Sequence, residues 1–162
     1  MEKRIDSATN LMKALKALKT QFNDICADNT SNSTVPAYWD YDTEYSYQNN
    51  IEEIEKLFSE ESRIRIALDK YNCTHQVEGY KMTIAEALVR MGQLKSLISN
   101  LTVLANKSSY YRERASYNSE SIDMKTLYDV KVAKEDLKKY QRELSRLQVA
   151  VDKTNINSKV EY

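Results

Sequence analysis

The chain has 162 residues and a mass of 18.8 kDa, which is long enough to bury a core without disulfides or a structural metal. Charged residues make up 30% of it with zero formal net charge, and it contains only two Gly and one Pro, a composition that favours long exposed helices over sheets. The mean hydropathy is −0.67 and no apolar run approaches the roughly 18 residues that span a bilayer, which excludes an integral membrane protein.

The start of the chain indicates the compartment. Residues 1–6 carry charges of both signs and no apolar segment follows, unlike a secretory signal or a transit peptide. Cys26 and Cys73 have no metal-binding spacing. Two cysteines without an export signal are most simply reduced thiols, so we expect a cytoplasmic protein.

Two amphipathic helices are predicted in the first half of the chain. The first has apolar residues three or four positions apart, at Ile5, Ala8, Met12, Leu15, Leu18, Phe22 and Ile25. The second begins near Asn50 and has the same pattern at Ile51, Ile54, Leu57, Ile64 and Leu68. The loop between them, about 27–49, is longer than a helical hairpin usually needs.

This first loop is aromatic and acidic. Its aromatic residues include Tyr38, Trp39 and Tyr41, and carboxylates are dense across residues 40–61. We expect the aromatic residues to belong to an interaction surface. The carboxylates are interpreted as a solvated helix face or, alternatively, as a surface that docks on the basic residues around Arg112 and Arg114 of the same chain or of a neighbouring copy.

Two further helices are predicted in the second half. Thr83 and Glu86 form a capping-box pattern, and the apolar residues that follow are Ala87, Met91, Leu94, Ile98, Leu101 and Ala105. The last helix has a coiled-coil seam at Val130, Ala133, Leu137, Tyr140, Leu144, Leu147 and Val151. The seam predicts a helix of roughly 28 residues, about 40 Å long.

The second long loop, about 107–125, is aromatic and basic. Its candidate interaction residues are Tyr110, Tyr111, Arg112 and Arg114. Tyrosines with flanking arginines are common in protein–protein contacts, and an aromatic loop that packs on its own helical bundle is a further alternative. The same mixture occurs in single-stranded nucleic-acid platforms, but the zero net charge argues against that alternative.

An internal similarity links the two halves. Residues 62–72 reappear in related form as residues 145–155, and Val77-Glu78 matches Val160-Glu161. We therefore predict one helical domain, 1–162, made of two duplicated helix-loop-helix hairpins, 1–80 and 81–162. The matched dipeptides are hypothesised to pair as a short β ribbon. Asn72 and Asn155 are predicted to end their helices in the left-handed conformation.

The sequence lacks the residue patterns that catalytic sites usually contain. His75 is the single histidine and lies in a polar connector, so it cannot supply the paired ligands of a di-iron bundle. The chain has no glycine-rich phosphate loop, no zinc spacing and no nucleophile beside a base. We expect no enzyme activity, no cofactor, no bound metal and no small-molecule substrate.

Several of these segments resemble a known family. Residues 83–88 with Arg90 and Leu94, the Asn72-Cys73-Thr74 turn, and Asp129-Val130 before the last helix are similar to the septicolysin-like family of small bacterial helical proteins. The resemblance covers most of the chain and implies a helical fold. The family has an arginine- and serine-containing stretch before its last helix, which corresponds here to Arg112, Arg114 and Ser116. The family name implies a cytolysin.

These observations lead to one expected function and two alternatives. We expect an all-α bundle of long helices with coiled-coil packing that forms a homo-oligomer and acts as a structural or binding protein of bacterial or phage type. Another protein partner is also compatible with the aromatic loops. The first alternative is a haemolysin-like, membrane-active protein whose helices refold onto a membrane, although neutral charge and modest apolar stripes argue against it. The second is the nucleic-acid binder described above.

Overall fold

The computed structural model describes residues 4–38, 45–114 and 121–162. The chain divides into two compact units, one comprising Met1–His75 and Asp152–Tyr162 and the other Gln76–Val151, called here unit 1 and unit 2. The described residues form four helices and a few short antiparallel strands. The expectation of a mostly helical fold is confirmed, and its assignment to one domain stays a prediction.

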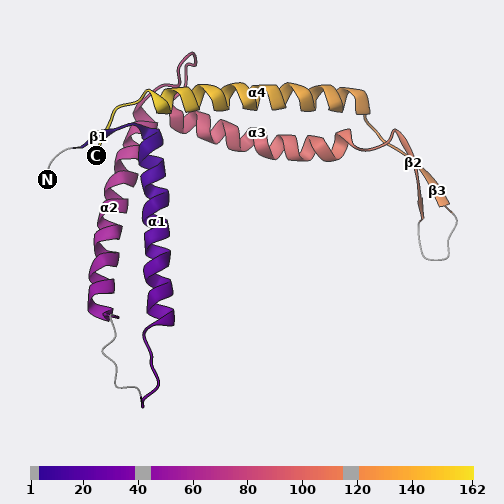
Figure 1. The fold of residues 1–162 in the computed structure, drawn as a ribbon. Helices are drawn as coiled ribbons and strands as arrows, with labels where there is room; N and C mark the ends of the chain where they lie inside the picture. Colours follow the sequence, from indigo (N-terminus) through magenta and orange to yellow (C-terminus); the bar gives the residue numbers. More distant parts are fainter. Residues whose placement is uncertain (1–3, 39–44, 115–120) are drawn as a thin grey trace. The chain divides into compact units, whose positions relative to one another are not determined.

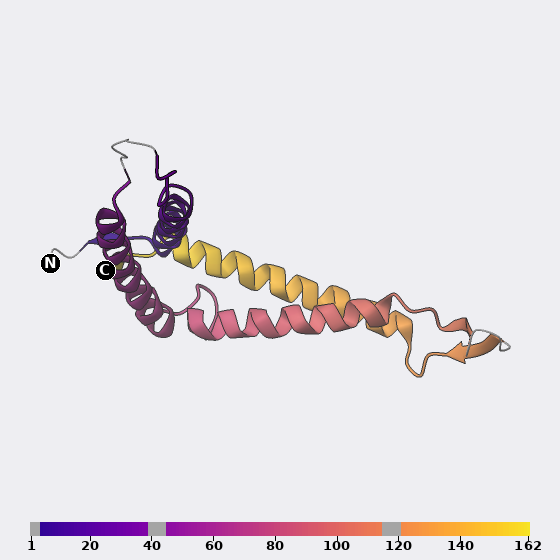
Figure 2. The same cartoon turned by 90° about the horizontal axis from the view of Figure 1, so that it is seen from below.

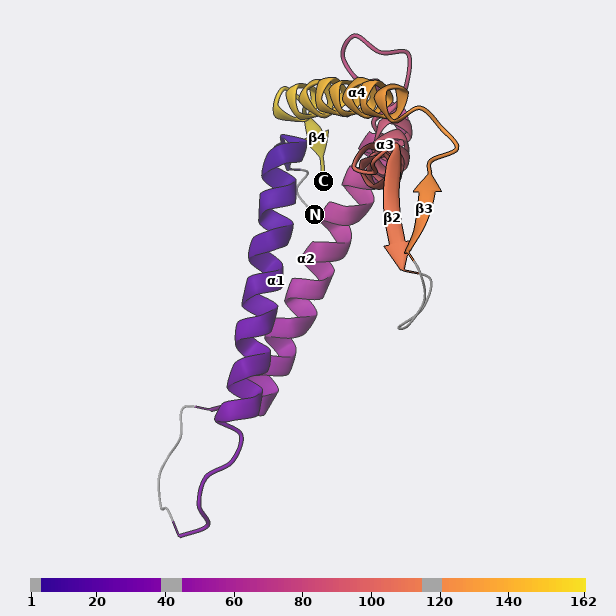
Figure 3. The same cartoon turned by 90° about the vertical axis from the view of Figure 1, so that its right-hand side faces the viewer.

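Unit 1 contains a hairpin of two long helices, α1 (Ala8–Ser31) and α2 (Tyr47–Thr74), which lie side by side (Figures 1 and 3). Each begins at a serine, Ser7 or Ser46, whose side chain accepts a hydrogen bond from a backbone N–H of the first turn. The apolar stripes meet along the hairpin, and their buried members are Ala8, Leu11, Ile64, Leu68 and Tyr71. Both helices extend beyond the predicted segments at their loop ends.

A polar network fastens the loop end of this hairpin. Asn50 of α2 donates to Asp28 Oδ2 at 2.7 Å and to Asn29 Oδ1 at 2.9 Å, and Tyr45 donates to Asn29 Oδ1 at 3.0 Å. Hydrogen bonds from Asn32 and Asn50 hold the pKa of Asp28 below its ordinary value of 3.8. The helix ends that flank the first long loop are therefore bound to each other.

Two short strands, β1 (Ile5–Asp6) and β4 (Val160–Glu161), form an antiparallel pair in unit 1. The prediction of a strand at Val160-Glu161 is confirmed, but its hypothesised partner, Val77-Glu78, is wrong. Ile5 was also predicted to begin a helix, whereas it lies in β1. Ser158 Oγ accepts a 2.7 Å hydrogen bond from Ala8 N, which holds the C-terminal segment against the start of α1.

In unit 2 the connector between α2 and the next helix is a tight turn. Val77 N donates to Met82 O and Tyr80 N donates to Val77 O, both at 3.0 Å. Gly79 has φ +81°, a conformation that a side chain would strain. Val77 is buried, so a hydrophobic anchor and backbone hydrogen bonds together fix the turn that carries Tyr80.

The second pair of helices comprises α3 (Ile84–Ala105) and α4 (Val130–Ile156), which lie side by side over the part of α4 in unit 2 (Figures 1 and 2). The predicted capping box at the start of α3 is confirmed: Thr83 Oγ1 accepts from Glu86 N, and Glu86 Oε2 accepts from Thr83 N at 2.7 Å. The buried apolar side chains of α3 and the matching part of α4 are Ile84, Ala87, Met91, Leu94, Ala105, Val130, Ala133, Leu147 and Val151.

The predicted helix stops at Asn72 and Asn155 are wrong. Apart from glycine, none of the described residues has a positive φ. Helix α2 continues past Asn72 to Thr74 and ends where His75 takes an extended conformation. Asn155 lies within α4 and is buried, so burial and helix continuation outweigh its turn preference.

Much of the second long loop is not a loop. Strands β2 (Tyr110–Arg114) and β3 (Ser121–Lys125) form an antiparallel hairpin beyond the loop ends of α3 and α4 (Figure 2). The prediction of a loop at about 107–125 is therefore wrong for these ten residues. Backbone pairing between nearby segments satisfies their polar groups without a helix.

Candidate functional site

The predicted interaction residues divide between two places. Tyr110, Tyr111, Arg112 and Arg114 all lie on strand β2 of unit 2. Tyr38, in the first long loop, is 84% exposed. Trp39 and Tyr41 lie outside the described residues, so the structure does not test whether the aromatic residues of that loop gather into one surface.

The register of the β hairpin separates its side chains onto two faces. Tyr111 pairs with Met124 and Glu113 pairs with Ile122, whereas Arg112 pairs with Asp123. Because side chains alternate along a strand, Tyr111, Met124 and Ile122 lie on one face, called here the apolar hairpin face, and the exposed Glu113 is the one charged side chain among these two cross-strand pairs. They are 38%, 37% and 50% exposed, so nothing described in the chain covers this face fully.

The opposite face is polar. Arg112 Nε donates to Asp123 Oδ1 at 2.9 Å, and both side chains are more than two thirds exposed. Such a surface ion pair contributes less than about 1 kcal/mol to stability. It nevertheless pairs the positive charge of Arg112 with a carboxylate of the same hairpin. Tyr110 and Lys125, the next cross-strand pair on this face, are exposed.

The base of the hairpin is attached to the helices by two contacts. Thr126 N donates to Ser109 O at 3.1 Å, and the Tyr128 hydroxyl donates to Leu104 O at 2.8 Å. The second contact adds a hydrogen bond to a carbonyl at the C-terminal end of α3 that also accepts from Lys107 N. The hairpin therefore begins directly beside the last turn of α3.

Apolar side chains continue from this point along α3. Leu97, Leu101 and Leu104 are spaced by four and three residues, so they share one face of the helix, called here the α3 flank. Leu97 is exposed, and Leu101 and Leu104 are half-buried. Three leucines on one face that remain partly open to water form a second surface suited to a partner.

The sequence contained a signal for the hairpin that helical periodicity obscured. Ile122, Asp123, Met124 and Lys125 alternate between apolar and charged side chains, which is the pattern of a half-exposed strand. Ile122 and Met124 were absent from the predicted interaction residues, and the structure brings them together with Tyr111.

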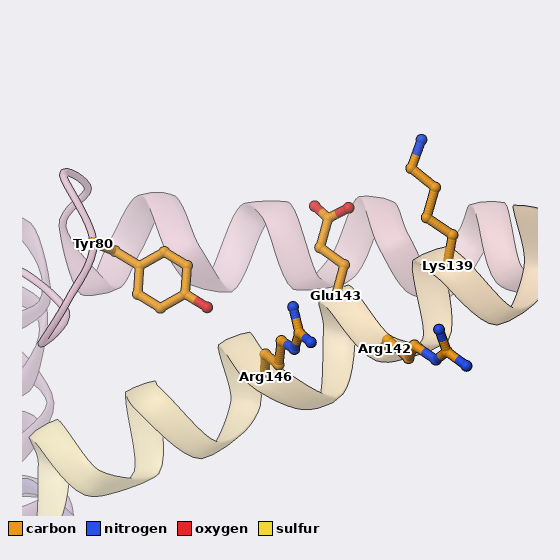
Figure 4. Close-up of a pocket in the computed structure, with 5 residues that line it drawn as sticks. All are labelled: Tyr80, Lys139, Arg142, Glu143 and Arg146. Atoms are coloured by element: carbon orange, nitrogen blue, oxygen red, sulfur yellow. The ribbon is translucent and has the colours of Figure 1, made fainter.

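A pocket of about 380 Å³ lies elsewhere in unit 2. It is lined by Tyr80, Lys139, Arg142, Glu143 and Arg146, drawn in Figure 4. Arg90 of α3 donates to Glu143 Oε1 from Nε at 3.0 Å and from Nη2 at 2.6 Å. This pair links the two helices at the edge of the pocket, which sequence patterns did not identify.

The described residues hold no cluster of side chains that could form a metal centre. Over residues 4–38, 45–114 and 121–162, no group of three or more His, Cys, Asp or Glu side chains could hold a metal ion. The pKa of Glu86 is held below its ordinary value of 4.5 by hydrogen bonds from the Thr83 backbone and side chain, which is a capping effect.

Comparisons with known proteins find no relative: no family model, no curated protein and no solved structure matches this chain. The similarity to the septicolysin-like family therefore stays a prediction. In the part of the chain that the structure describes, every helix is too short or too polar to cross a lipid bilayer.

Proposed function

We propose that the protein is a non-enzymatic, cytoplasmic helical protein that self-associates, and that the β2–β3 hairpin is where a second copy binds. The observation that carries this proposal is the apolar hairpin face of Tyr111, Ile122 and Met124. A two-stranded hairpin is marginally stable by itself in water. One with an uncovered apolar face gains stability when another surface covers it.

The free energy that the hairpin contributes to association can be worked out from these side chains. Full burial of a large apolar side chain contributes about 1.5–3 kcal/mol, so covering three that are already about half-buried contributes roughly 3 kcal/mol per copy. Two copies together gain about 6 kcal/mol, and association costs about 4–15 kcal/mol in lost freedom, so two hairpins alone leave little or no net stability for a dimer. The α3 flank, which ends beside the hairpin base, supplies the additional apolar surface in this proposal.

The apolar seam of α4 also supports the proposal that two copies associate. Leu137, Tyr140 and Leu144 follow coiled-coil spacing, and each is only half-buried. A pair of helices leaves the outer sides of its seam open, and a four-helix coiled-coil arrangement closes them. We propose that two copies complete this packing. We also propose that the α1–α2 and α3–α4 hairpins are duplicated units, since residues 62–72 and 145–155 fall at corresponding ends of α2 and α4.

A second copy fits this surface electrostatically. The chain carries 24 basic and 24 acidic side chains, so two copies have no net repulsion. Arg112 is already paired with Asp123, which leaves its guanidinium group less available to a phosphate backbone or to the acidic segment at residues 40–61. The hairpin surface therefore favours a protein partner over nucleic acid.

Light scattering after size exclusion tests the proposal. The wild-type chain is expected at a discrete multiple of 18.8 kDa, and the double variant Tyr111→Ser, Ile122→Ser is expected at a lower mass at the same micromolar concentration. Tyr110→Ser is the matched control, because Tyr110 adjoins Tyr111 in sequence but lies on the polar face. Far-ultraviolet circular dichroism checks that the helices remain folded.

The proposal has two outcomes that contradict it. A wild-type monomer at all accessible concentrations would remove self-association as the function. A double variant that keeps the wild-type mass would show that association uses a different surface. Dye leakage from liposomes is the corresponding test of the haemolysin-like alternative, and a self-associating scaffold is expected to cause none.

A further inference from the structure

We propose that the pocket lined by Tyr80, Lys139, Arg142, Glu143 and Arg146 binds the phosphate group of a small, soluble phosphorylated molecule. This inference is independent of self-association, because the pocket shares no residue with the apolar hairpin face or the α3 flank. It rests on the charge and the spacing of the lining residues, three of which are exposed cations, and on the volume of the pocket.

Three cations line the pocket from one helix. Lys139, Arg142 and Arg146 are spaced by three and four residues on α4, so their side chains leave the same face of the helix. Among the ion pairs of the described residues, none includes any of the three. The Lys139 ammonium group lies 5.3 Å from the Tyr140 ring centre, a contact that leaves its charge in place.

The one acidic lining residue does not cancel this charge. Glu143 accepts two hydrogen bonds on Oε1 from Arg90, which enters from α3. Its carboxylate is thereby matched by a guanidinium group that does not line the pocket. The net lining charge available to a ligand therefore comes from Lys139, Arg142 and Arg146, and it is positive.

A polar aromatic side chain, Tyr80, lines the pocket from outside α4. Figure 4 shows Tyr80 extending from the connector so that its hydroxyl end points toward the side of Arg146 and Glu143. Tyr80 N donates a hydrogen bond to Val77 O across the turn at Gly79, and this bond fixes the backbone position of Tyr80. Tyr80 can donate a hydrogen bond to an anion, and its ring offers a flat surface to the rest of a ligand.

Charge and size together favour a small phosphate compound. Arginine forks bind the oxygens of phosphate in a fixed geometry, and a phosphate dianion matches several cations better than a single carboxylate does. The volume of about 380 Å³ lies within the usual range for small-molecule pockets, about 300–1,000 Å³. A polynucleotide would need a longer basic track, and the chain as a whole is neutral.

Isothermal titration calorimetry of the full chain with pyrophosphate tests the inference, because it measures both the affinity and the number of binding sites. Saturable binding with one site per chain is expected. Arg142→Gln and Arg146→Gln are each expected to weaken it by about tenfold or more, because each removes a charge-assisted hydrogen bond. Lys138→Gln is the matched control: it removes the same charge from α4 at a position that does not line the pocket. It is expected to change affinity by less than about twofold, because salt screens a charge that makes no direct contact with the ligand.

Three results would overturn the inference. One is the absence of saturable pyrophosphate binding at millimolar concentration. Another is wild-type affinity in both arginine variants, which would place the anion elsewhere. The last is binding of a single-stranded oligonucleotide without binding of pyrophosphate, which would assign the basic face to nucleic acid. The arginine variants are expected to keep the wild-type mass in light scattering, so failure here is distinguishable from failure of the self-association proposal.

Discussion

Replacing Leu94 by alanine tests whether the face of α3 that packs within unit 2 is the core that stabilises this unit. Leu94 is 0% exposed, so Leu94→Ala removes buried methyl groups and leaves a cavity. Such substitutions cost about 2–5 kcal/mol, and we expect about 3 kcal/mol at this position. Leu88 is the matched control, because it is a leucine of the same helix that is 45% exposed and lies outside the α3 flank.

The control has a smaller expected effect for a physical reason. Water already covers nearly half of Leu88 and fills the space that alanine leaves, so Leu88→Ala is expected to cost about 1 kcal/mol or less. Alanine is the best helix former, so neither substitution weakens α3 through helix propensity.

Thermal unfolding followed by circular dichroism at equal protein concentrations measures both effects. For a chain of this length, 1 kcal/mol lowers the Tm by about 2–4 °C, which predicts about 6–12 °C for Leu94→Ala and about 4 °C or less for Leu88→Ala. Equal shifts in the two variants would refute the assignment of Leu94 to the core, and a larger shift for Leu88→Ala would place the buried face of α3 on its other side.

The remaining predictions concern the start of α3 and the turn before it. Thr83→Ala removes the N-cap oxygen that accepts from Glu86 N and is expected to cost about 1 kcal/mol of unfolding free energy in urea; an unchanged urea midpoint would contradict the capping role. Because the pKa of Glu86 is lowered on folding, its ionised form stabilises the fold above its ordinary pKa of 4.5, and this contribution is lost as the pH falls through the lower folded value. The wild type is therefore expected to be more stable than Glu86→Gln at pH 7 but not at a pH well below 4.5, and a difference independent of pH would refute this. Gly79→Ala meets no atom within 4 Å, so its expected cost of roughly 1 kcal/mol comes from the positive φ alone, and a stability equal to the wild type would show that the turn relaxes.

A three- and four-residue spacing of apolar side chains, repeated along each segment, made the helices predictable. The seam from Val130 to Val151 repeats over six turns, and only a helix brings side chains with that spacing to one face. The start of α3 was predictable for a local reason, since Thr83 and Glu86 satisfy each other's backbone donors within three residues. In both cases the determining interactions lie close together in sequence.

Features that depend on distant partners were predicted less well. Val160-Glu161 does form a strand, but its partner is set by which segment lies beside it, and Ile5-Asp6 is more than 150 residues away in the chain. The matched position of Val77-Glu78 in the sequence repeat carried no information about that neighbour, because Val77 is already used to close the turn to Met82. Asn155 likewise has a local preference for turns, which its burial within α4 overrides.

The β hairpin shows how the same limitation bears on function. Tyr111 and Arg112 were selected from sequence as neighbours in one loop, yet the strand places them on opposite faces, Arg112 beside Asp123 and Tyr111 beside Met124. An aromatic-basic cluster suited to nucleic acid is thereby divided into a charge-matched face and an apolar face. Sequence composition cannot distinguish these arrangements, because the cross-strand register determines which side chains meet. The apolar face is the one whose partial exposure to water is unfavourable, so variants at Tyr111 and Ile122 bear on self-association more directly than variants at Arg112.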